Sequence, residues 1–217
     1  ALDGQPVAPH APADGLVEGA VWVPVEDGEL PAYRAMPAAA GPHPILLVVQ
    51  EIFGVDEYLK DICRRAAHAG YVAIAPELYA REARPGECET LEAVLEIVRN
   101  APDARVLADL DSSAEFAVRE CSGDPTRIGV TGFCWGGRIV WLYAAPEPRL
   151  RAGIAWYGRL VGDTDPRHPR QPLDVAPELR VPVLGLYGSE DSGIPLETVE
   201  RMKAALDASD SGSTFVV

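Results

Sequence analysis

The sequence Gly132-Phe133-Cys134-Trp135-Gly136-Gly137 follows the apolar run Ile128-Gly129-Val130 and precedes an apolar stretch with helical period. A strand that turns directly into a helix forces the residue at the turn into strained backbone angles. Glycines on both sides of that residue let the strand and the helix approach where any Cβ atom would clash. The pattern predicts a nucleophile elbow with Cys134 at its apex.

The predicted position of Cys134 also suggests a chemical role. The first N–H groups of a helix are unpaired, and the helix macrodipole favours an anion beside them. A thiol at this place is expected to have a depressed pKa, which would make it nucleophilic. The alternative is a buried structural cysteine in a glycine-rich turn, and the elbow pattern alone does not separate the two.

Composition limits the classes of function that this chain can have. Its 217 residues fit one domain, and 47% apolar with 24% charged residues is ordinary for a globular protein. The net charge of −14 argues against a nucleic-acid partner, because phosphate contacts need a basic surface. The longest apolar run, Ile45–Val49, is far too short to span a bilayer, so no membrane partner is expected either.

Four cysteines lie far apart, with no C-x-x-C pair and no histidine at metal-ligand spacing. The sequence therefore predicts no disulfide framework, no metal site and no cofactor. Cys63 and Cys121 belong to apolar sets with helical period and are expected to be core thiols. Cys88 lies in a polar loop.

The order of the elements predicts an α/β fold. Residues 1–15 are expected to form an irregular arm before a single domain over 16–217. Apolar runs alternate with helical periods, which indicates βαβ units in a doubly wound, mainly parallel sheet with helices on both faces. Strands are expected at 19–25, 30–36, 45–49, 71–75, 127–131, 152–157, 181–187 and 214–217; helices are expected at 57–69, within 88–100 and 103–121, after the elbow, and at 196–208. A long loop is expected over 161–178.

Three of the predicted strands end in residues that are capable of chemistry. Gln50–Gly54 follows the first buried strand, Cys134 follows the middle one, and Gly188–Asp191 follows a later one. Ligands of such sheets bind at the carboxyl ends of the strands. This convergence favours a functional rather than a structural Cys134.

A catalytic triad on this fold runs nucleophile, acid, histidine along the chain. Asp191 stands where the acid is expected, although a simple turn aspartate is the alternative. All four histidines, His10, His43, His68 and His168, precede Asp191. His168 is expected to be a loop residue, so the sequence is expected to lack the segment that carries the catalytic histidine, which would follow Val217.

Four segments together resemble the dienelactone hydrolase (carboxymethylenebutenolidase) family: Val49–Gly54, Ala75–Arg81, Gly132–Gly137 and Gly188–Asp191. The resemblance covers most of residues 17–217 in order and spacing. It implies an α/β-hydrolase fold and a hydrolase that opens an ester or lactone through a thioester on Cys134. It also implies a Cys134–Asp191–histidine triad whose histidine follows the last strand.

The resemblance assigns further roles. Glu51 would take the proton of the Cys134 thiol when substrate binds, and the backbone N–H groups of Trp135 and Ile52 would form the oxyanion hole. Arg81 would bind a substrate carboxylate. A surface glutamate and a solvated loop arginine are the alternatives for Glu51 and Arg81.

Two other functions remain open from the sequence. A cysteine-dependent amidotransferase uses a similar elbow, but its base normally lies in a C-terminal His-x-Glu that is missing here. The second alternative is a non-catalytic binding protein with a hydrolase fold. The expected partner is a small-molecule ester or lactone, and the expected state is a monomer or small homo-oligomer. A cytoplasmic location is expected, or a periplasmic or secreted one if an export signal preceded Ala1.

Overall fold

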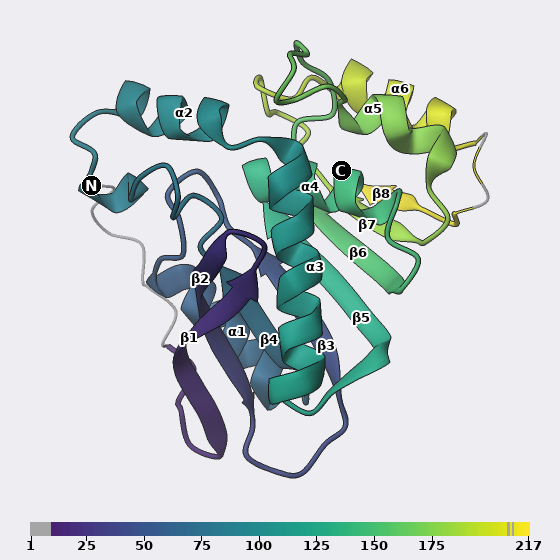
Figure 1. The fold of residues 1–217 in the computed structure, drawn as a ribbon. Coiled ribbons are helices and arrows are strands. Elements are labelled where there is room, and N and C mark those ends of the chain that lie inside the picture. The colour runs from purple at the N-terminus through teal and green to yellow at the C-terminus, as the bar shows by residue number, and fades with distance from the viewer. Residues whose placement is uncertain (1–9, 208, 210) are drawn as a thin grey trace.

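A computed structural model describes residues 10–207, 209 and 211–217 of the chain. Their central feature is one eight-stranded sheet with the order β1-β2-β4-β3-β5-β6-β7-β8 (Figure 1). The strands are β1 (Leu16–Val25), β2 (Gly28–Pro37), β3 (His43–Val49), β4 (Val72–Pro76), β5 (Gly123–Phe133), β6 (Leu150–Trp156), β7 (Val183–Leu186) and β8 (Thr214–Val216).

The sheet is mainly parallel. β1 and β2 form an antiparallel hairpin, and β2 pairs antiparallel with β4, whereas every other neighbouring pair is parallel. The strands β4, β3, β5, β6, β7 and β8 therefore all end at the same edge of the sheet. The predicted doubly wound, mainly parallel α/β fold is confirmed.

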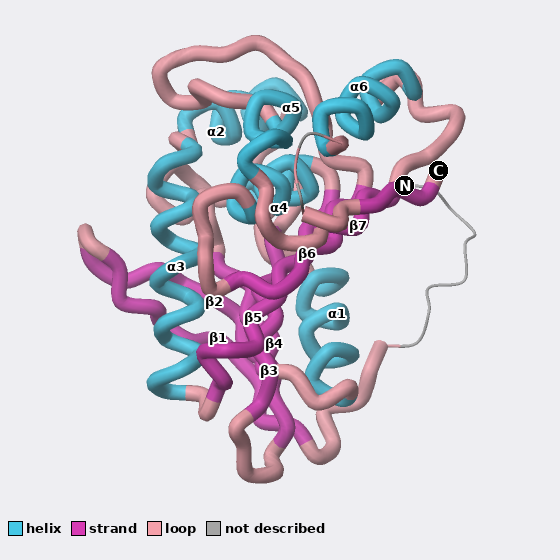
Figure 2. The backbone as a smooth tube through the Cα atoms, turned by 90° about the vertical axis from the view of Figure 1, so that its right-hand side faces the viewer, coloured by secondary structure: helices cyan, strands magenta, loops and turns pink. Residues whose placement is uncertain are grey.

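Helices cover both faces of this sheet. α1 packs on one face through Leu59, Cys63 and Ala67, while α3 and α4 pack on the other, and Figure 2 shows α1 and α3 on opposite sides of the strands. The helices are α1 (Glu57–His68), the short η1 (Pro85–Glu87), α2 (Leu91–Asn100), α3 (Asp103–Glu120), α4 (Trp135–Ala144), α5 (Pro172–Val175), the short η2 (Ala176–Glu178) and α6 (Leu196–Leu206). None of the described helices is both long and apolar enough to cross a bilayer.

The apolar runs of the sequence form the buried parts of these strands and helices. Ile45, Leu47 and Val49 of β3 are fully buried between the two helical layers, as their continuous apolar run predicts. Cys63 is a fully buried residue of α1, and Cys121 is buried at the end of α3. The expectation that both are core thiols is confirmed, and burial raises the pKa of Cys63 to about 12.

Two expectations need adjustment. The long loop predicted over 161–178 contains a helical turn, α5, directly followed by η2, because Gln171 and Asp174 form a capping box that starts it. Most of the expected N-terminal arm, residues 1–9, lies outside the described residues. Residues 10–15 lie outside any strand, and the Ala11 N–H donates to Asp61 of α1 at 2.6 Å.

Candidate active site

Cys134 lies between the end of β5 and the start of α4, with φ 53° and ψ −114°. Such angles are rare for a residue with a side chain and cost about 1–3 kcal/mol. The Cys134 N–H donates to the carbonyl oxygen of Trp156 at 3.0 Å, which ties the turn to the end of β6. The predicted strand-turn-helix geometry with Cys134 at its apex is confirmed.

The glycines of the elbow are explained by close approaches of backbone to backbone. A Cβ atom on Gly132 would lie 2.4 Å from the Gly136 carbonyl oxygen, and one on Gly136 would lie 2.5 Å from that of Gln50. A Cβ atom on Gly137 would lie 2.5 Å from the Trp156 carbonyl oxygen. The first turn of α4 therefore sits directly against the ends of β3 and β6, and larger residues would force them apart.

Glu51 follows β3 and starts a tight turn that closes through a bridge to Gly54, whose φ is 82°. The buried side chain of Gln50 anchors this turn from one side, since its Oε1 accepts from the Leu78 N–H at 3.1 Å. The Glu77 carboxylate anchors the other side by accepting from the Val55 N–H at 3.2 Å. The backbone around Glu51 is therefore held in place beside the elbow.

Tyr157, which follows β6, holds the carboxyl group of Glu51. Its hydroxyl donates to Glu51 Oε1 at 2.9 Å, and its own φ is 38°. Its ring lies 6.4 Å from that of Phe133, centroid to centroid. Burial, together with the charge of Glu51, raises the pKa of Tyr157, so this hydroxyl remains a hydrogen-bond donor. The sequence reasoning missed Tyr157, although its place after the strand beside the elbow was a usable signal.

Asp191 lies in the turn after β7, and its side chain is exposed. Its Oδ1 accepts from the Gly193 N–H at 2.8 Å, and its negative charge acts on the Cys134 thiol. The structure thus brings Cys134, Glu51 and Asp191 to one end of the sheet, where three separate strands end.

The Cys134 thiol has a raised pKa. Burial is the largest cause, and the negative charges of Glu51 and Asp191 raise it further. The N–H of Trp135 and the positive charge of Arg159 oppose this shift without reversing it. The sequence-based expectation of a depressed pKa was wrong, because desolvation and two acidic neighbours outweigh the helix terminus. A raised pKa disfavours the thiolate form of Cys134.

The expected oxyanion hole combines the N–H groups of Trp135 and Ile52. The Trp135 N–H faces the sulfur, where it hydrogen-bonds the thiol and lowers its pKa. Ile52 lies in the turn that follows β3. Gln50, which comes directly before this turn, contacts the first turn of α4. The two residues belong to neighbouring segments, and their joint role stays a prediction.

Every histidine of this sequence lies in the described residues, and each contacts groups away from Cys134. His10 lies 3.9 Å from Asp61, His43 contacts the Ala39 carbonyl oxygen, and His68 contacts that of Pro12. His168 contacts the Ala101 carbonyl oxygen at 3.0 Å and Asp165 at 3.2 Å. His168 is a loop residue, as expected, and docks its loop on the segment between α2 and α3.

Arg81 has two carboxylate partners. Its guanidinium donates to Asp109 of α3 at 2.7 Å and to Asp27 of the β1–β2 turn at 2.6 Å. Arg81 forms four hydrogen bonds to these two residues, so its single positive charge is shared by the carboxylates of Asp27 and Asp109. A substrate carboxylate would have to displace one of them, so this geometry favours a structural role over the expected substrate contact.

Arg138, directly after the elbow glycines, fixes the long loop to the helical layer. Its buried guanidinium donates to both oxygens of the buried Asp103 at 2.7 and 2.8 Å and to the Gln171 side chain at 2.9 Å. It also donates to the Arg170 carbonyl oxygen at 3.0 Å. This network joins α4, α3 and the residues before α5.

Replacing Arg138 by alanine is expected to lower the free energy of unfolding by about 3–5 kcal/mol, because it leaves Asp103 buried without its partner. Denaturant unfolding measures this loss. The matched control is Arg201→Ala, since Arg201 is exposed on α6 and should change stability by no more than about 0.5 kcal/mol. A loss below about 1 kcal/mol for Arg138→Ala would contradict a stabilising role for the network.

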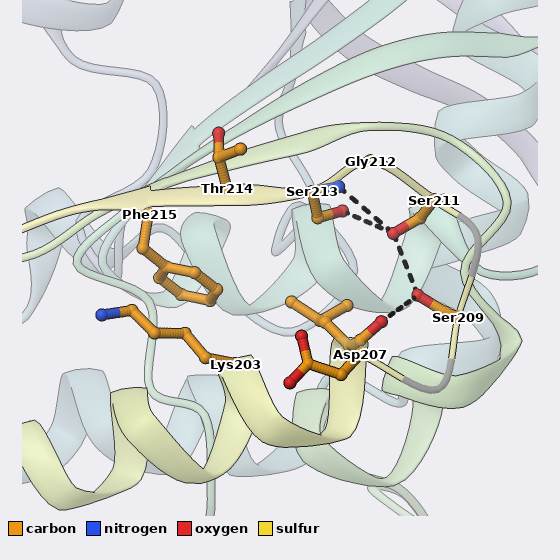
Figure 3. A pocket seen from close by; sticks show the side chains of 9 residues that line it. Lys203, Asp207, Ser209, Ser211, Gly212, Ser213, Thr214 and Phe215 are labelled. Carbon is orange, nitrogen blue, oxygen red and sulfur yellow. Dashed lines mark hydrogen bonds between the residues drawn. The ribbon is translucent and has the colours of Figure 1, made fainter.

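A cavity of about 620 Å³ lies elsewhere, between the end of α6 and β8 (Figure 3). Lys203 and Phe215 line it, together with a chain of hydrogen-bonded serines, Ser209, Ser211 and Ser213. Ser211, Gly212 and Ser213, which line it, come directly before β8, whereas Cys134 follows the carboxyl end of β5. Among the described residues, no three His, Cys, Asp or Glu side chains could together hold a metal ion.

Comparisons with known proteins agree with this geometry. Residues 30–216 match the model of the "Dienelactone hydrolase family". A Methylorubrum extorquens protein named "Putative carboxymethylenebutenolidase" is 54% identical over 225 residues, covering 100% of this chain and 76% of that protein. An Escherichia coli protein of the same name is 50% identical over 210 residues, covering 96% of this chain and 77% of that protein.

Solved structures give the same result for the fold. The crystal structure of a "Putative Dienelactone Hydrolase" from Klebsiella pneumoniae has a TM-score of 0.91 and 50% identity, covering 94% of this chain and 85% of that chain. An acylaminoacyl peptidase superposes with a TM-score of 0.76 at 19% identity, covering 94% of this chain and 37% of that chain. The second likeness concerns the α/β-hydrolase fold alone.

Proposed function

The chain belongs to the dienelactone hydrolase family, and we propose that it opens a carboxylic ester or lactone through a thioester on Cys134. One observation carries this proposal: Cys134 is held at the apex of a strained elbow where the charges of Glu51 and Asp191 both act on its thiol. A purely structural cysteine needs neither the strain nor the acidic neighbours.

In the proposed first step, Glu51 takes the thiol proton and the sulfur attacks the ester carbonyl carbon. A carbon–sulfur bond forms, and the negative charge moves to the carbonyl oxygen, where the N–H groups of Trp135 and Ile52 stabilise it. When the carbonyl re-forms, the bond to the alkoxy oxygen breaks, and that oxygen receives the proton held by Glu51. In a lactone this step opens the ring and leaves its acyl end on Cys134.

The second step hydrolyses the thioester. A general base takes a proton from a water molecule, whose oxygen attacks the same carbonyl carbon. The carbon–sulfur bond then breaks, the sulfur receives that proton, and a carboxylic acid leaves. Activating this water requires a general base, whose contribution is typically about 10²–10⁴-fold. Asp191 is proposed to orient a histidine for this purpose, as the acid of the triad does in this fold. No histidine among the described residues contacts Asp191.

The 217-residue chain is therefore expected to react stoichiometrically with an activated ester and then to turn over slowly. Mixing it with p-nitrophenyl acetate should release a burst of p-nitrophenol equal to the chain concentration, followed by a steady rate lower by about 10²–10⁴-fold than that of a form with a histidine after β8. Rapid multiple turnover by the 217-residue chain would contradict the proposal that hydrolysis of the thioester needs a histidine after β8. It would make His168 the next candidate for the general base.

The same experiment separates the competing functions. A cysteine-dependent amidotransferase would release ammonia from glutamine, which an ester hydrolase of this design should not do. A non-catalytic binding protein would show no burst in either form. A burst that disappears on replacement of Cys134, without ammonia release, supports the ester or lactone hydrolase.

A further inference from the structure

Arg159 carries a positive charge that acts on the Cys134 thiol and lowers its pKa. It lies two residues after Tyr157, in the segment that leaves β6 beside the elbow. The start of this segment is tied directly to the nucleophile, because the Trp156 carbonyl oxygen accepts from the Cys134 N–H at 3.0 Å. Arg159 itself is exposed.

The backbone around Arg159 is held rigidly. A Cβ atom on Gly158 would lie 2.3 Å from the Arg138 backbone nitrogen, so this residue is pressed against the first turn of α4. The Tyr187 hydroxyl donates to the Gly158 carbonyl oxygen at 3.0 Å. On the other side, Leu160 is fully buried and its carbonyl oxygen accepts from the Leu173 N–H. The exposed side chain of Arg159 therefore starts from a fixed point at the rim of the site.

Arg159 also differs from most other cations of the chain. Among the described residues, it forms no ion pair and no hydrogen bond, although the chain carries 33 acidic residues against 19 lysines and arginines. Arg81, in contrast, is bound on both sides by Asp27 and Asp109. Of these two arginines, only Arg159 has a guanidinium that is free to bind a further anion.

The negative charges around Cys134 suggest what the unpaired Arg159 guanidinium could do. Glu51 and Asp191 both place negative charge near the thiol, so an anionic substrate would be repelled from the site unless a cation offset them. An arginine guanidinium can bind a carboxylate through two parallel hydrogen bonds. Arg159 is a positive group whose charge acts on the Cys134 thiol.

We propose that Arg159 binds the anionic group of the substrate and sets a preference for carboxylate-bearing esters, while Arg81 stabilises the fold through Asp27 and Asp109. This inference rests on the proposed function of the site and changes which arginine meets the substrate. It makes Arg159 a specificity-determining residue of the acylation step and assigns it no part in bond making or breaking.

The test compares acylation by two p-nitrophenyl esters of similar size, the anionic p-nitrophenyl hydrogen glutarate and the neutral p-nitrophenyl valerate. The burst gives the second-order acylation rate constant of the 217-residue chain for each ester. Arg159→Gln is expected to lower the constant for the anionic ester about tenfold, which corresponds to about 1.4 kcal/mol, and to leave the neutral ester within about twofold. Arg159→Lys should keep most of the preference, because it retains the charge.

Two control variants complete the test. Arg81→Gln should change the constants for both esters by the same factor and should lower the stability measured by denaturant unfolding. Arg201→Gln should change neither ester, since Arg201 lies exposed on α6. An equal effect of Arg159→Gln on both esters would overturn the proposal, as would a selective loss of the anionic ester in Arg81→Gln.

Alkylation distinguishes failure of this inference from failure of the proposed function. Iodoacetate and iodoacetamide differ mainly in charge and react with Cys134 without any ester chemistry. Arg159→Gln should lower the ratio of their alkylation rates severalfold even if neither ester acylates the chain, in which case only the hydrolase proposal would fail. An unchanged ratio would overturn the assignment of Arg159.

Discussion

Replacing Cys134 by alanine is expected to abolish the burst with p-nitrophenyl esters and to lower the acylation rate by about 10³-fold or more. The reason is that the proposed reaction has no other nucleophile, and loss of the nucleophile of a catalytic triad removes several orders of magnitude in rate. Stopped-flow measurement of p-nitrophenol release gives the rate directly. Alanine keeps the Cβ atom of cysteine and meets the same backbone strain at φ 53°, so the variant should remain folded.

Two cysteine controls make this result specific. Cys88→Ala removes a half-buried thiol from the loop after η1 and should leave the burst unchanged. Cys63→Ala removes a fully buried thiol and should lower stability by about 1–3 kcal/mol without removing the burst. A full burst from Cys134→Ala would show that another side chain is acylated.

Glu51→Gln is expected to change two rates in opposite directions. Acylation by the ester should fall by about 10²–10⁴-fold, because glutamine cannot accept the thiol proton. Alkylation by iodoacetamide near neutral pH should become faster. The negative charge of Glu51 raises the pKa of Cys134, so its removal increases the fraction of thiolate. The glutamine oxygen can still accept the hydrogen bond of Tyr157, which preserves the turn.

Asp191→Asn is the matched variant for Glu51→Gln. It also removes a charge that raises the pKa of the thiol, but it leaves the proposed proton acceptor in place. Alkylation and acylation are both expected to become faster in this variant. If Glu51→Gln accelerated both reactions in the same way, Glu51 would act only through its charge and would not be the base.

The elbow could be predicted from the sequence because its steric requirements appear directly in the residue types. Gly132, Gly136 and Gly137 meet backbone atoms of neighbouring segments at distances that exclude a Cβ atom. The parallel sheet was predictable for a similar reason, since a continuous apolar run such as Ile45–Val49 suits a strand covered on both faces. Local pattern and tertiary structure agree at these positions.

The electrostatics of the site could not be predicted in the same way. The pKa of Cys134 depends on burial and on residues from two other strand ends, whose effect exceeds that of the helix terminus visible in the sequence. The partners of Arg81 lie in the β1–β2 turn and in α3, and nothing local indicates them. Tyr157 and Arg159 lie just after the end of β6. The residues at this strand end form no recognisable catalytic motif, so the sequence did not point to them.

The most direct test of the Cys134 thioester is to locate the acyl group in the 217-residue chain after the burst. Intact-mass measurement, proteolytic digestion and peptide mass spectrometry would identify the modified residue, and neutral hydroxylamine would show whether the bond is a thioester. We predict a single acyl group on the peptide that contains Cys134, released by hydroxylamine. An acyl group on Cys88, on a serine or on a lysine, or an unmodified Cys134 after a full burst, would contradict the proposed mechanism.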